Sequence, residues 1–462
     1  MRRIAYFGKP LIFLAAALLC VTVAAQEPSR KDIRKSNELV SDGNKAFNQK
    51  NYRDAIDKYA EAVVMVPRNA TAHFWKGYAH YYLKEYPMAL AELNMAEEQG
   101  HAAVDVSKVR WFIHYEGKNF DAALADVKRG LQAEPNNQMM LRAAGDIYFE
   151  KKNYPDSLAA YRQALLAAPN DGTLYYAIAR VLQASGDVKG QEEAAAIAVS
   201  KPNQFLLESN YILADAQHRQ RKFEQALATY NKLLAAHPDN IQIYRSMGDV
   251  FRGQSKFSDA IDITRQAINK WPQDGNLYTD ISWYYSLNGQ HKEAVETAQS
   301  AVRLLPEQYM GFTNLCRAHN DLKQYQFALT ACNNALRLNP DDGETYFYLG
   351  RAYRELGKTA EANRAFDRSV PGLVTFTQNN PDYSDGFYLL GNAYSENGNF
   401  EKALEAYRKC LQLSPKFSRA WYNSGAIYVH LNKKNEAMTQ YQALASLDAD
   451  LASKLKQAID QM

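Results

Sequence analysis

Small, apolar and aromatic residues recur along the chain with a spacing of 34 residues. In residues 384–417 Gly391 comes first, a Gly-Asn pair follows at 398–399, and then come Ala403, Tyr407 and Pro415. The Gly-Asn pair predicts a turn between two helices, and the proline predicts the end of the second helix before the next unit begins. The small residues predict that the two helices pack closely. The pattern therefore indicates a helix–turn–helix unit that repeats along the chain.

Twelve such units fill residues 36–451 when Gly or Ala at the eighth position and Pro at the 32nd are used as markers. Because each helix pair exposes an apolar face that it cannot cover alone, neighbouring units must stack into one array. The predicted segments are a polar leader at 26–35, five units in 36–206, five in 207–383, two in 384–451 and a capping helix at 452–462. No linker rich in Pro, Gly or Ser marks a second domain, so the array leaves no room for a catalytic one.

Two units depart from the pattern. The fifth unit, residues 172–206, is degenerate because Gln191 and Ala195 stand at its packing positions, and we expect the array to bend or loosen there. The tenth unit carries about seven extra residues within 371–385. Pro371-Gly372 predicts that a helix ends or breaks, and we interpret the insertion as a surface excursion. Whether the insertion has a function stays open.

The 34-residue unit resembles the tetratricopeptide repeat. That family has Gly or Ala at position 8, an aromatic residue near 11, Ala at 20, an aromatic residue at 24, Ala at 27 and Pro at 32, and residues 384–417 match nearly all of these positions. The resemblance implies an all-α fold: a right-handed superhelical α-solenoid of about twelve units with a C-terminal capping helix. It extends over 36–451 and indicates a family and a fold.

The first 25 residues read as a secretory signal peptide. Arg2, Arg3 and Lys9 precede an apolar run that ends in Val23-Ala24-Ala25, so the small residues at −3 and −1 predict cleavage after Ala25. The apolar run is short for a membrane span, and an uncleaved anchor is the alternative. The sequence therefore predicts a periplasmic or secreted protein, with membrane contact only if the signal segment is retained.

The charge balance argues against two classes of partner. The whole chain carries a formal charge of +3, and the predicted signal peptide contributes three positive charges and no negative ones. The mature chain is then close to neutral, without the basic footprint of a nucleic-acid or anionic-membrane binder. We therefore expect neither partner.

Three cysteines remain in the predicted mature chain: Cys316, Cys332 and Cys410. Cys316 and Cys332 occupy positions 8 and 24 of one unit, on facing helices, and an oxidising compartment could join them. We prefer the interpretation that both are small buried residues replacing a glycine and an aromatic residue. The pairing stays open.

A search for catalytic residues finds no recognisable constellation. Leu356-Gly357-Lys358-Thr359 resembles the end of a phosphate-binding loop, but Ala352 stands where the motif needs glycine. His73 and His80 lie seven residues apart without a close Cys/His cluster, so a structural role is expected instead of a metal site. No nucleophile elbow or dinucleotide fingerprint is present. The sequence predicts a non-enzyme without cofactor or metal.

The resemblance also implies where a partner binds. In the family, the first helix of each unit lines a concave groove, and positions 5, 9 and 12 of this chain are rich in aromatic residues and arginine. Such residues are typical of protein interfaces. The candidate partner-binding residues are Phe74, Tyr78, Tyr81, Phe112, Tyr115, Arg142, Tyr176, Arg180, Tyr211, Arg245, Arg252, Arg317, Arg351 and Arg354.

The favoured hypothesis is an exported scaffold that binds a protein or peptide in this groove, in a cell-envelope assembly or secretion complex. Whether the ligand carries acidic residues stays open. Two structural alternatives stay open. The aromatic residues can serve packing, and acidic residues such as Asp321, Glu344 and Asp385 can pair with the arginines and cancel their field. A different function, binding of an envelope polysaccharide on the aromatic N-terminal half, is the alternative to protein binding.

Overall fold

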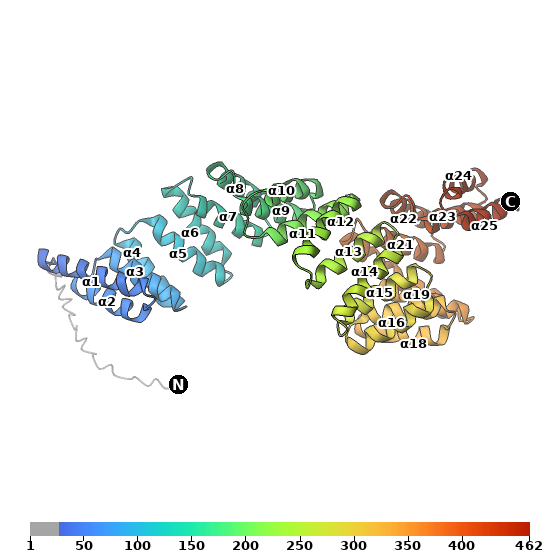
Figure 1. Ribbon diagram of the computed structural model, residues 1–462, viewed down its shortest axis with the longest axis horizontal. Helices are drawn as coiled ribbons and strands as arrows, with labels where there is room; N and C mark the ends of the chain where they lie inside the picture. Colours follow the sequence, from blue (N-terminus) through green and yellow to red (C-terminus); the bar gives the residue numbers. More distant parts are fainter. Residues whose placement is uncertain (1–26) are drawn as a thin grey trace, which may run out of the picture. The chain divides into compact units, whose positions relative to one another are not determined.

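The computed structural model of the chain describes residues 27–462, and the predicted signal peptide, residues 1–25, lies outside the described residues. Every regular element in the described part is an α-helix, and the 25 helices pack in sequence order as twelve helix–turn–helix pairs followed by α25 (Figure 1). The predicted all-α solenoid of about twelve units is therefore confirmed.

The described chain divides into two compact units, one ending at Pro169 and one beginning at Asn170. We call them unit 1 and unit 2. The helices of unit 1 are α1 (Arg30–Asn48), α2 (Tyr52–Met65), α3 (Ala70–Tyr82), α4 (Tyr86–Glu98), α5 (Ala103–Glu116), α6 (Phe120–Ala133), α7 (Gln138–Glu150) and α8 (Tyr154–Ala167).

Unit 2 holds the remaining seventeen described helices. They are α9 (Gly172–Ser185), α10 (Val188–Ser200), α11 (Leu206–Arg219), α12 (Phe223–Ala236), α13 (Ile241–Gly253), α14 (Phe257–Lys270), α15 (Gly275–Leu287), α16 (His291–Leu304), α17 (Tyr309–Asp321), α18 (Tyr325–Leu338), α19 (Gly343–Glu355), α20 (Thr359–Asn379), α21 (Ser384–Glu396), α22 (Phe400–Leu413), α23 (Ser418–His430), α24 (Lys434–Ala445) and α25 (Ala449–Asp460).

The two helices of a pair approach closely where a glycine faces an aromatic ring. A Cβ atom added to Gly43 would lie 2.5 Å from the ring of Tyr59, and one added to Gly391 would lie 2.5 Å from the ring of Tyr407. Both rings are buried, and the Tyr407 hydroxyl donates a hydrogen bond to Oδ1 of Asn392 over 2.6 Å. Small residues at position 8 therefore make room for the aromatic residue at position 24.

One residue in the turn between paired helices has a positive φ angle. Glycine fills the position at Gly186, Gly289, Gly357 and Gly398, where the left-handed conformation carries no Cβ penalty. In unit 1 lysine fills the equivalent positions, with φ angles between 56° and 61°, at Lys50, Lys84, Lys118 and Lys152. The turn therefore has the same backbone conformation where lysine replaces glycine.

Helix α1 begins earlier than expected. Residues 26–35 were predicted as a polar leader, but α1 starts at Arg30. The Ser29 side chain accepts a hydrogen bond from the Asp32 backbone N–H, while the Asp32 carboxylate accepts one from the Ser29 backbone N–H. This capping box satisfies two backbone donors, so the helix extends into the polar segment.

Helix α20 continues through the insertion and corrects the expectation of a helix end at Pro371-Gly372. It runs for 21 residues, with the proline inside. Proline removes one backbone donor, but Leu373 and Thr377 are buried beyond it and anchor the extra turns. A Cβ atom on Gly372 would lie 2.6 Å from the backbone nitrogen of Gly343, so this glycine allows the close contact with α19.

The degenerate fifth unit still forms two helices, α9 and α10. Three alanines of α10 are buried, and Gln191 is also buried there. Its side-chain nitrogen donates to the Ile212 carbonyl over 3.0 Å and to the Asp215 carboxylate over 2.9 Å. Hydrogen bonds to α11 thus replace part of the apolar contact that the thin second helix lacks.

The cysteines differ from the preferred interpretation. Cys316 in α17 and Cys332 in α18 form a disulfide, with Cα atoms 5.2 Å apart. Both residues are buried, as expected, but they are bonded to each other because positions 8 and 24 face one another across the pair. Among the described residues Cys410 keeps a free thiol, and burial raises its pKa.

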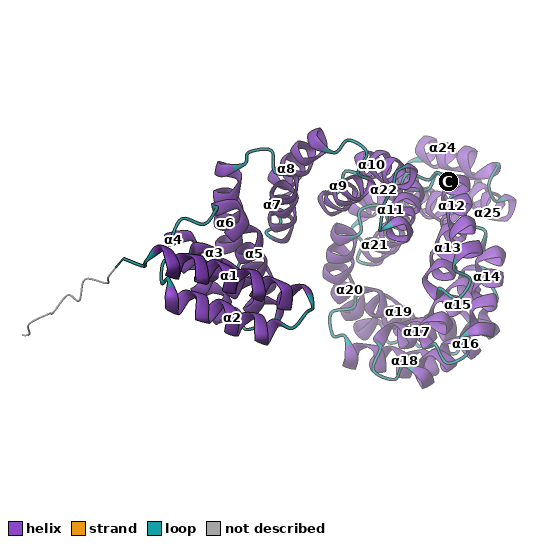
Figure 2. Cartoon of the chain, turned by 60° about the vertical axis from the view of Figure 1, so that its left-hand side comes forward, coloured by secondary structure: helices purple, strands orange, loops and turns teal. Residues whose placement is uncertain are grey.

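Unit 2 curves until distant helices meet. The segment before α21 returns to α11 and α13, as the views in Figures 1 and 2 show. Two ion pairs join this segment to α11 and α13. They link Arg219 to Asp382, 163 residues apart, and Arg252 to Asp385, 133 residues apart. The extra turns of α20 lead into this segment, which we call the strap (residues 380–385).

Candidate functional site

A cavity of about 1040 Å³ opens on the inner side of unit 2. Its wall comes mainly from α15, α17, α19, α21 and α23, the first helices of five successive pairs. Twelve aromatic residues line it, together with seven acidic and five basic ones. The cavity has the volume and the aromatic lining of a ligand-binding cleft, with nearly balanced charge.

Arginines lie against aromatic rings at the cavity wall and beside it. The guanidinium carbon of Arg252 lies 4.8 Å from the Trp283 ring centre and 4.7 Å from the Tyr383 ring centre. The guanidinium carbon of Arg317 lies 5.7 Å from Trp283 and 5.2 Å from Tyr348. Each guanidinium therefore contacts two rings, in contacts worth about 0.5–2 kcal/mol each. We call this series the arginine–aromatic stack.

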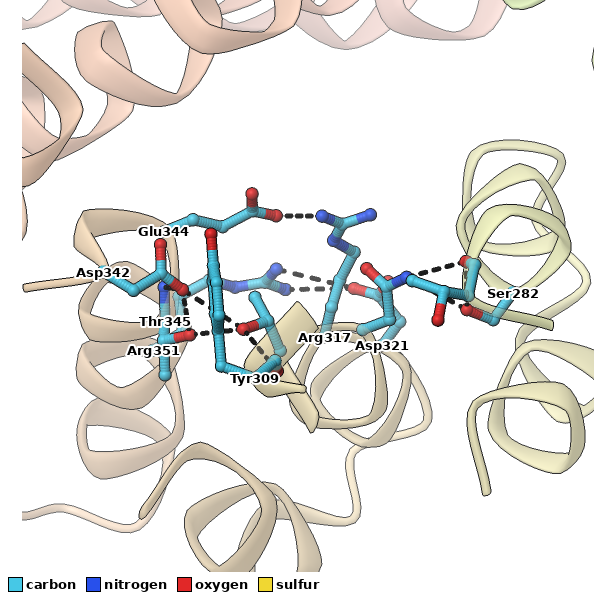
Figure 3. Close-up of polar contacts among 11 residues, drawn as sticks. Ser282, Tyr309, Arg317, Asp321, Asp342, Glu344, Thr345 and Arg351 are labelled. Carbon is cyan, nitrogen blue, oxygen red and sulfur yellow. Dashed lines mark hydrogen bonds and ion pairs between the residues drawn. The ribbon is translucent and has the colours of Figure 1, made fainter. Parts of the chain in front are cut away.

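Carboxylates from neighbouring pairs neutralise the arginines of the cavity wall (Figure 3). Glu344 forms an ion pair with Arg317, and Asp321 lies 3.5 Å from Arg351. Asp321 and Glu344 are among the acidic residues that the sequence suggested as cancelling partners. The wall therefore offers arginines that are already paired, so a ligand carboxylate must compete with an internal one.

Two further predicted arginines have the same arrangement. Arg245 donates two hydrogen bonds to Asp280, over 2.6 and 3.2 Å, and Arg354 forms an ion pair with Glu396. Burial raises the pKa of Asp280, although Arg245 opposes this effect. Bidentate pairing fixes the Arg245 fork between α13 and α15, so this arginine joins helices.

A hydrogen-bond network fixes the floor of the cavity (Figure 3). The Thr313 hydroxyl in α17 contacts the Thr345 hydroxyl of α19 over 2.6 Å, and both hydroxyls lie against the Asp342 carboxylate. Burial raises the pKa of Asp342. On the other side Asn314 donates to Oγ of Ser282 in α15 over 3.0 Å. The network therefore ties three wall helices together.

Amide groups face the C-terminal part of the cavity. Asn423 of α23 donates to Oδ1 of Asn392 in α21 over 2.8 Å. The rings of Tyr388 and Phe417 lie 4.8 Å apart beside them, and Tyr422 also lines the cavity. Side-chain amides can bind a peptide backbone, and aromatic rings can contact its side chains. The candidate list from the sequence did not include these residues.

The strap closes one side of unit 2. Asp382 accepts two hydrogen bonds from Arg219, over 2.9 and 3.1 Å, and Asp385 accepts one from Arg252 over 2.8 Å. Tyr383 between them completes the arginine–aromatic stack against Arg252. The predicted surface excursion 371–385 is thus partly a structural wall, because its far end packs across unit 2.

The candidate residues of unit 1 form an aromatic surface of their own. Tyr78 lies 5.4 Å from Phe47 in a stacked contact, and Tyr81 lies 5.9 Å from Phe112 edge to face. Phe74 is buried against the His101 ring at 4.2 Å, so it serves packing. These residues lie in a different unit from the cavity.

The other candidates lie away from the cavity wall. Tyr115 packs edge to face on Trp111 at 5.8 Å, and Arg142 is half-buried on α7. Arg180 is exposed above the Tyr176 ring, 5.9 Å from its centre. The half-buried ring of Tyr211 packs on Tyr230, and burial raises the pKa of Tyr211 to about 12. The structure brings Arg317, Arg351 and Arg354 together at the cavity, with Arg245 and Arg252 beside them.

Two features of residues 27–462 bear on other functions. No group of three or more His, Cys, Asp or Glu residues in this part is arranged to hold a metal ion. In the same range, no helix has both the length and the apolar composition needed to cross a membrane. The cavity remains the most developed candidate site in the described chain.

Models of known protein families match most of the chain. Five family models, each described as a tetratricopeptide repeat, match residues 43–103, 113–172, 144–205, 208–240, 331–362, 384–417 and 418–451. The small glutamine-rich tetratricopeptide repeat-containing protein 2 of Saccharomyces cerevisiae is 36% identical over 76 residues. This stretch is 16% of the present chain and 22% of that protein's length.

Among solved structures, the chain is similar to the crystal structure of the APC/C hetero-tetramer Cut9-Hcn1. The TM-score is 0.42 and the sequence identity is 16%, over 92% of this chain and 96% of that one. The matched repeats cover most of the helix pairs described above, and residues 241–330 lie outside the matched stretches.

Proposed function

The chain belongs to the tetratricopeptide repeat family, and from this premise we propose that it is a non-catalytic scaffold that binds a segment of a partner protein in the cavity of unit 2. Proteins of this family generally bind protein partners. The observation that carries the proposal is the cavity itself, because its volume of about 1040 Å³ and its twelve aromatic residues suit a peptide segment.

The balance of charges suggests how the segment is held. Since the arginines Arg317, Arg351 and Arg354 already have carboxylate partners, long-range attraction of an acidic ligand is weak in the cavity. We propose that aromatic contacts supply most of the affinity and that amides such as Asn392 and Asn423 orient the backbone. The partner segment is then mixed in character, with aromatic or aliphatic side chains.

We also propose that the protein works outside the cytoplasm, in an assembly of the cell envelope. Two features support this location: the signal-peptide pattern that ends at Ala25, and the disulfide between Cys316 and Cys332. Disulfides persist in oxidising compartments, whereas cytosolic thiols are kept reduced. Sequencing of the N-terminus of the secreted protein tests the proposal, with Gln26 expected as the first residue.

Affinity capture from an envelope extract tests the binding function. The wild-type chain is compared with a variant that combines Tyr388→Ala and Tyr422→Ala, which removes two rings from the cavity wall. Phe327→Ala is the matched control, because Phe327 is an exposed aromatic residue on α18 outside the cavity wall. A partner retained by the wild type and by the control, but lost by the cavity variant, supports the proposal. Equal retention by all three folded proteins contradicts it.

An envelope polysaccharide is the second candidate ligand, and the aromatic surface of unit 1 favours it. The rings of Tyr52 and Tyr82 stack with centres 4.9 Å apart and planes at 12°, and Tyr82 is 44% exposed. Exposed flat rings can stack on sugars, and such contacts depend little on salt. Binding of an oligosaccharide that is lost with Tyr82→Ala and is unchanged between low and high salt would favour this candidate.

A further inference from the structure

The strap contacts α11, α13 and α15 with the residue types of an acidic, aromatic peptide. Over four residues it presents Asp382, Tyr383 and Asp385, and these meet two arginines and a tryptophan. Asp382 accepts two hydrogen bonds from the fork of Arg219, while Asp385 accepts one from Arg252. The Tyr383 ring also lies against the Arg252 guanidinium, 4.7 Å from its carbon, so charge and ring recognition act together.

The receiving surface is built on the other side of unit 2. It consists of Arg219 at the end of α11, Arg252 at the end of α13 and Trp283 on α15. The Arg252 side chain is only 10% exposed, so its contacts with the strap exclude most water. Arg219 and its partner Asp382 are more open, at 27% and 44% side-chain exposure. One end of the contact is therefore buried and the other is accessible.

Sequence separation distinguishes this contact from the rest of the array. Neighbouring pairs explain most ion pairs of unit 2, whereas the strap contacts span 163 and 133 residues. A solenoid stacks through nearest neighbours and does not require such a closure. The strap follows the extra turns of α20, so the additional residues of the tenth unit allow the chain to reach Arg219, Arg252 and Trp283.

We propose that the surface of Arg219, Arg252 and Trp283 is a binding site for an acidic, aromatic segment of a partner protein, and that the strap occupies this site in the free protein. The inference rests on the proposed function, because the partner segment that enters the cavity continues onto this surface. The partner supplies a carboxylate, an aromatic ring and a second carboxylate in the spacing of Asp382, Tyr383 and Asp385.

A tethered strap competes strongly with a partner. A segment linked to its site acts at an effective concentration in the millimolar range, so a free peptide of the same sequence binds the wild type poorly. Apparent affinity falls in proportion to the fraction of protein whose site is open. Weakening the strap therefore raises the apparent affinity for an added peptide without changing the site.

Fluorescence anisotropy with a labelled peptide tests the proposal on the full mature chain. The probe copies residues 379–387, and the control probe has Asn in place of both aspartates and Ala in place of tyrosine. The strap-released variant combines Asp382→Asn and Asp385→Asn, which keep the side-chain size. It is expected to bind the probe about tenfold or more tightly than the wild type at low salt.

Two variants control for the site and for charge. Adding Arg219→Gln to the strap-released variant should abolish the gain, since it removes the accessible fork. Glu396→Gln releases Arg354 elsewhere in the cavity and should give no gain. Binding of the control probe with the same affinity, or equal gains in the Glu396→Gln protein, would overturn the proposal.

Misfolding of the variant, failure of the strap proposal and failure of the proposed function give different results. If circular dichroism shows that the double variant is unfolded, Asp382→Asn alone, at the more exposed pair, replaces it with the same criterion. No gain in a folded strap-released protein shows that the strap is only structural. Capture of a partner that depends on Tyr388 and Tyr422 would then still support the proposed function, because those residues lie on α21 and α23, whereas the strap surface lies on α11, α13 and α15.

Discussion

Lysine occupies a left-handed backbone conformation four times in unit 1. Each of these residues stands in the turn between paired helices, where unit 2 uses glycine at four equivalent places. A Cβ atom in this region costs about 1–2 kcal/mol. The turns of unit 1 therefore contain strain that the helix packing on either side must offset.

Replacing Lys118 with glycine should stabilise the protein. The φ angle of 56° is free of penalty for glycine, and the gain is reduced by the larger entropy of glycine in the unfolded chain. We expect a net gain of about 0.5–1 kcal/mol in the free energy of unfolding, measured with urea. The control is Lys128→Gly inside α6, which should cost about 1 kcal/mol. Destabilisation by both changes would contradict this account.

His73 should make unit 1 more stable at mildly acidic pH. The hydrogen bond to Glu92, 2.6 Å long, raises the pKa of His73 above its usual 6.5, although burial and Lys76 oppose this. The folded state then holds the proton more tightly than the unfolded state. The stabilisation is complete below pH 6.5 and is lost as the pH rises through the folded-state pKa.

Urea unfolding between pH 6 and pH 8 measures this effect. The wild type is compared with His73→Gln, which keeps a hydrogen-bonding side chain but does not titrate. The difference in stability between the two proteins should shrink as the pH rises. Comparison with the variant is needed because burial lowers the pKa of His218, whose contribution has the opposite sign. A difference that does not change with pH would show that His73 stays neutral.

Residue types at the candidate site were predictable from the sequence, but their contacts were not. Arg317 and Arg351 follow from the repeat register, since position 9 of each unit points to one side of the first helix. Their neutralisation by Glu344 and Asp321 depends on the spacing of neighbouring pairs, so the sequence left it as one of two alternatives. The contact of Arg252 with Asp385 joins residues 133 positions apart, and no local pattern signals it.

At the scale of helices, local rules predicted most elements and failed where packing outweighs them. The small residue at position 8 and the aromatic residue at position 24 locate each pair, as Gly391 and Tyr407 illustrate. Pro371 is a helix breaker by local rules, yet α20 continues because buried Leu373 and the close contact at Gly372 hold the next turns. Tertiary packing had the larger free energy here.

The disulfide between α17 and α18 should stabilise unit 2. Its cysteines are separated by 16 residues, and closing a loop of this length contributes about 3 kcal/mol in the chain-entropy account. Adding a reductant should therefore lower the unfolding midpoint of the wild type. A variant with Cys316→Ala and Cys332→Ala should show the lower midpoint with or without reductant. If reductant lowers the unfolding midpoint of both proteins equally, the disulfide is not the cause of the change.

At the scale of the whole molecule, the array divides into parts that can be tested separately. Unit 2 contains the complete cavity, and its helices pack on one another from α9 to α25. Because solenoid stability is a sum of nearest-neighbour terms, a fragment starting at Asn170 should fold. We expect it to show a helical circular dichroism spectrum and to bind the cavity partner with unchanged affinity. Loss of helical structure in the fragment would show that unit 2 depends on unit 1.

The strap also gives unit 2 an unusual response to mechanical tension. An open solenoid extends under load like a spring, because its repeats are joined only to their neighbours. The ion pair between Arg252 and Asp385 instead bridges 133 residues of chain, and the pair at Arg219 lies beside it. Load applied at the two ends of unit 2 passes through these few side chains before it reaches most of the intervening helices. The protein should therefore resist small pulls stiffly and then yield in one large extension once the strap separates.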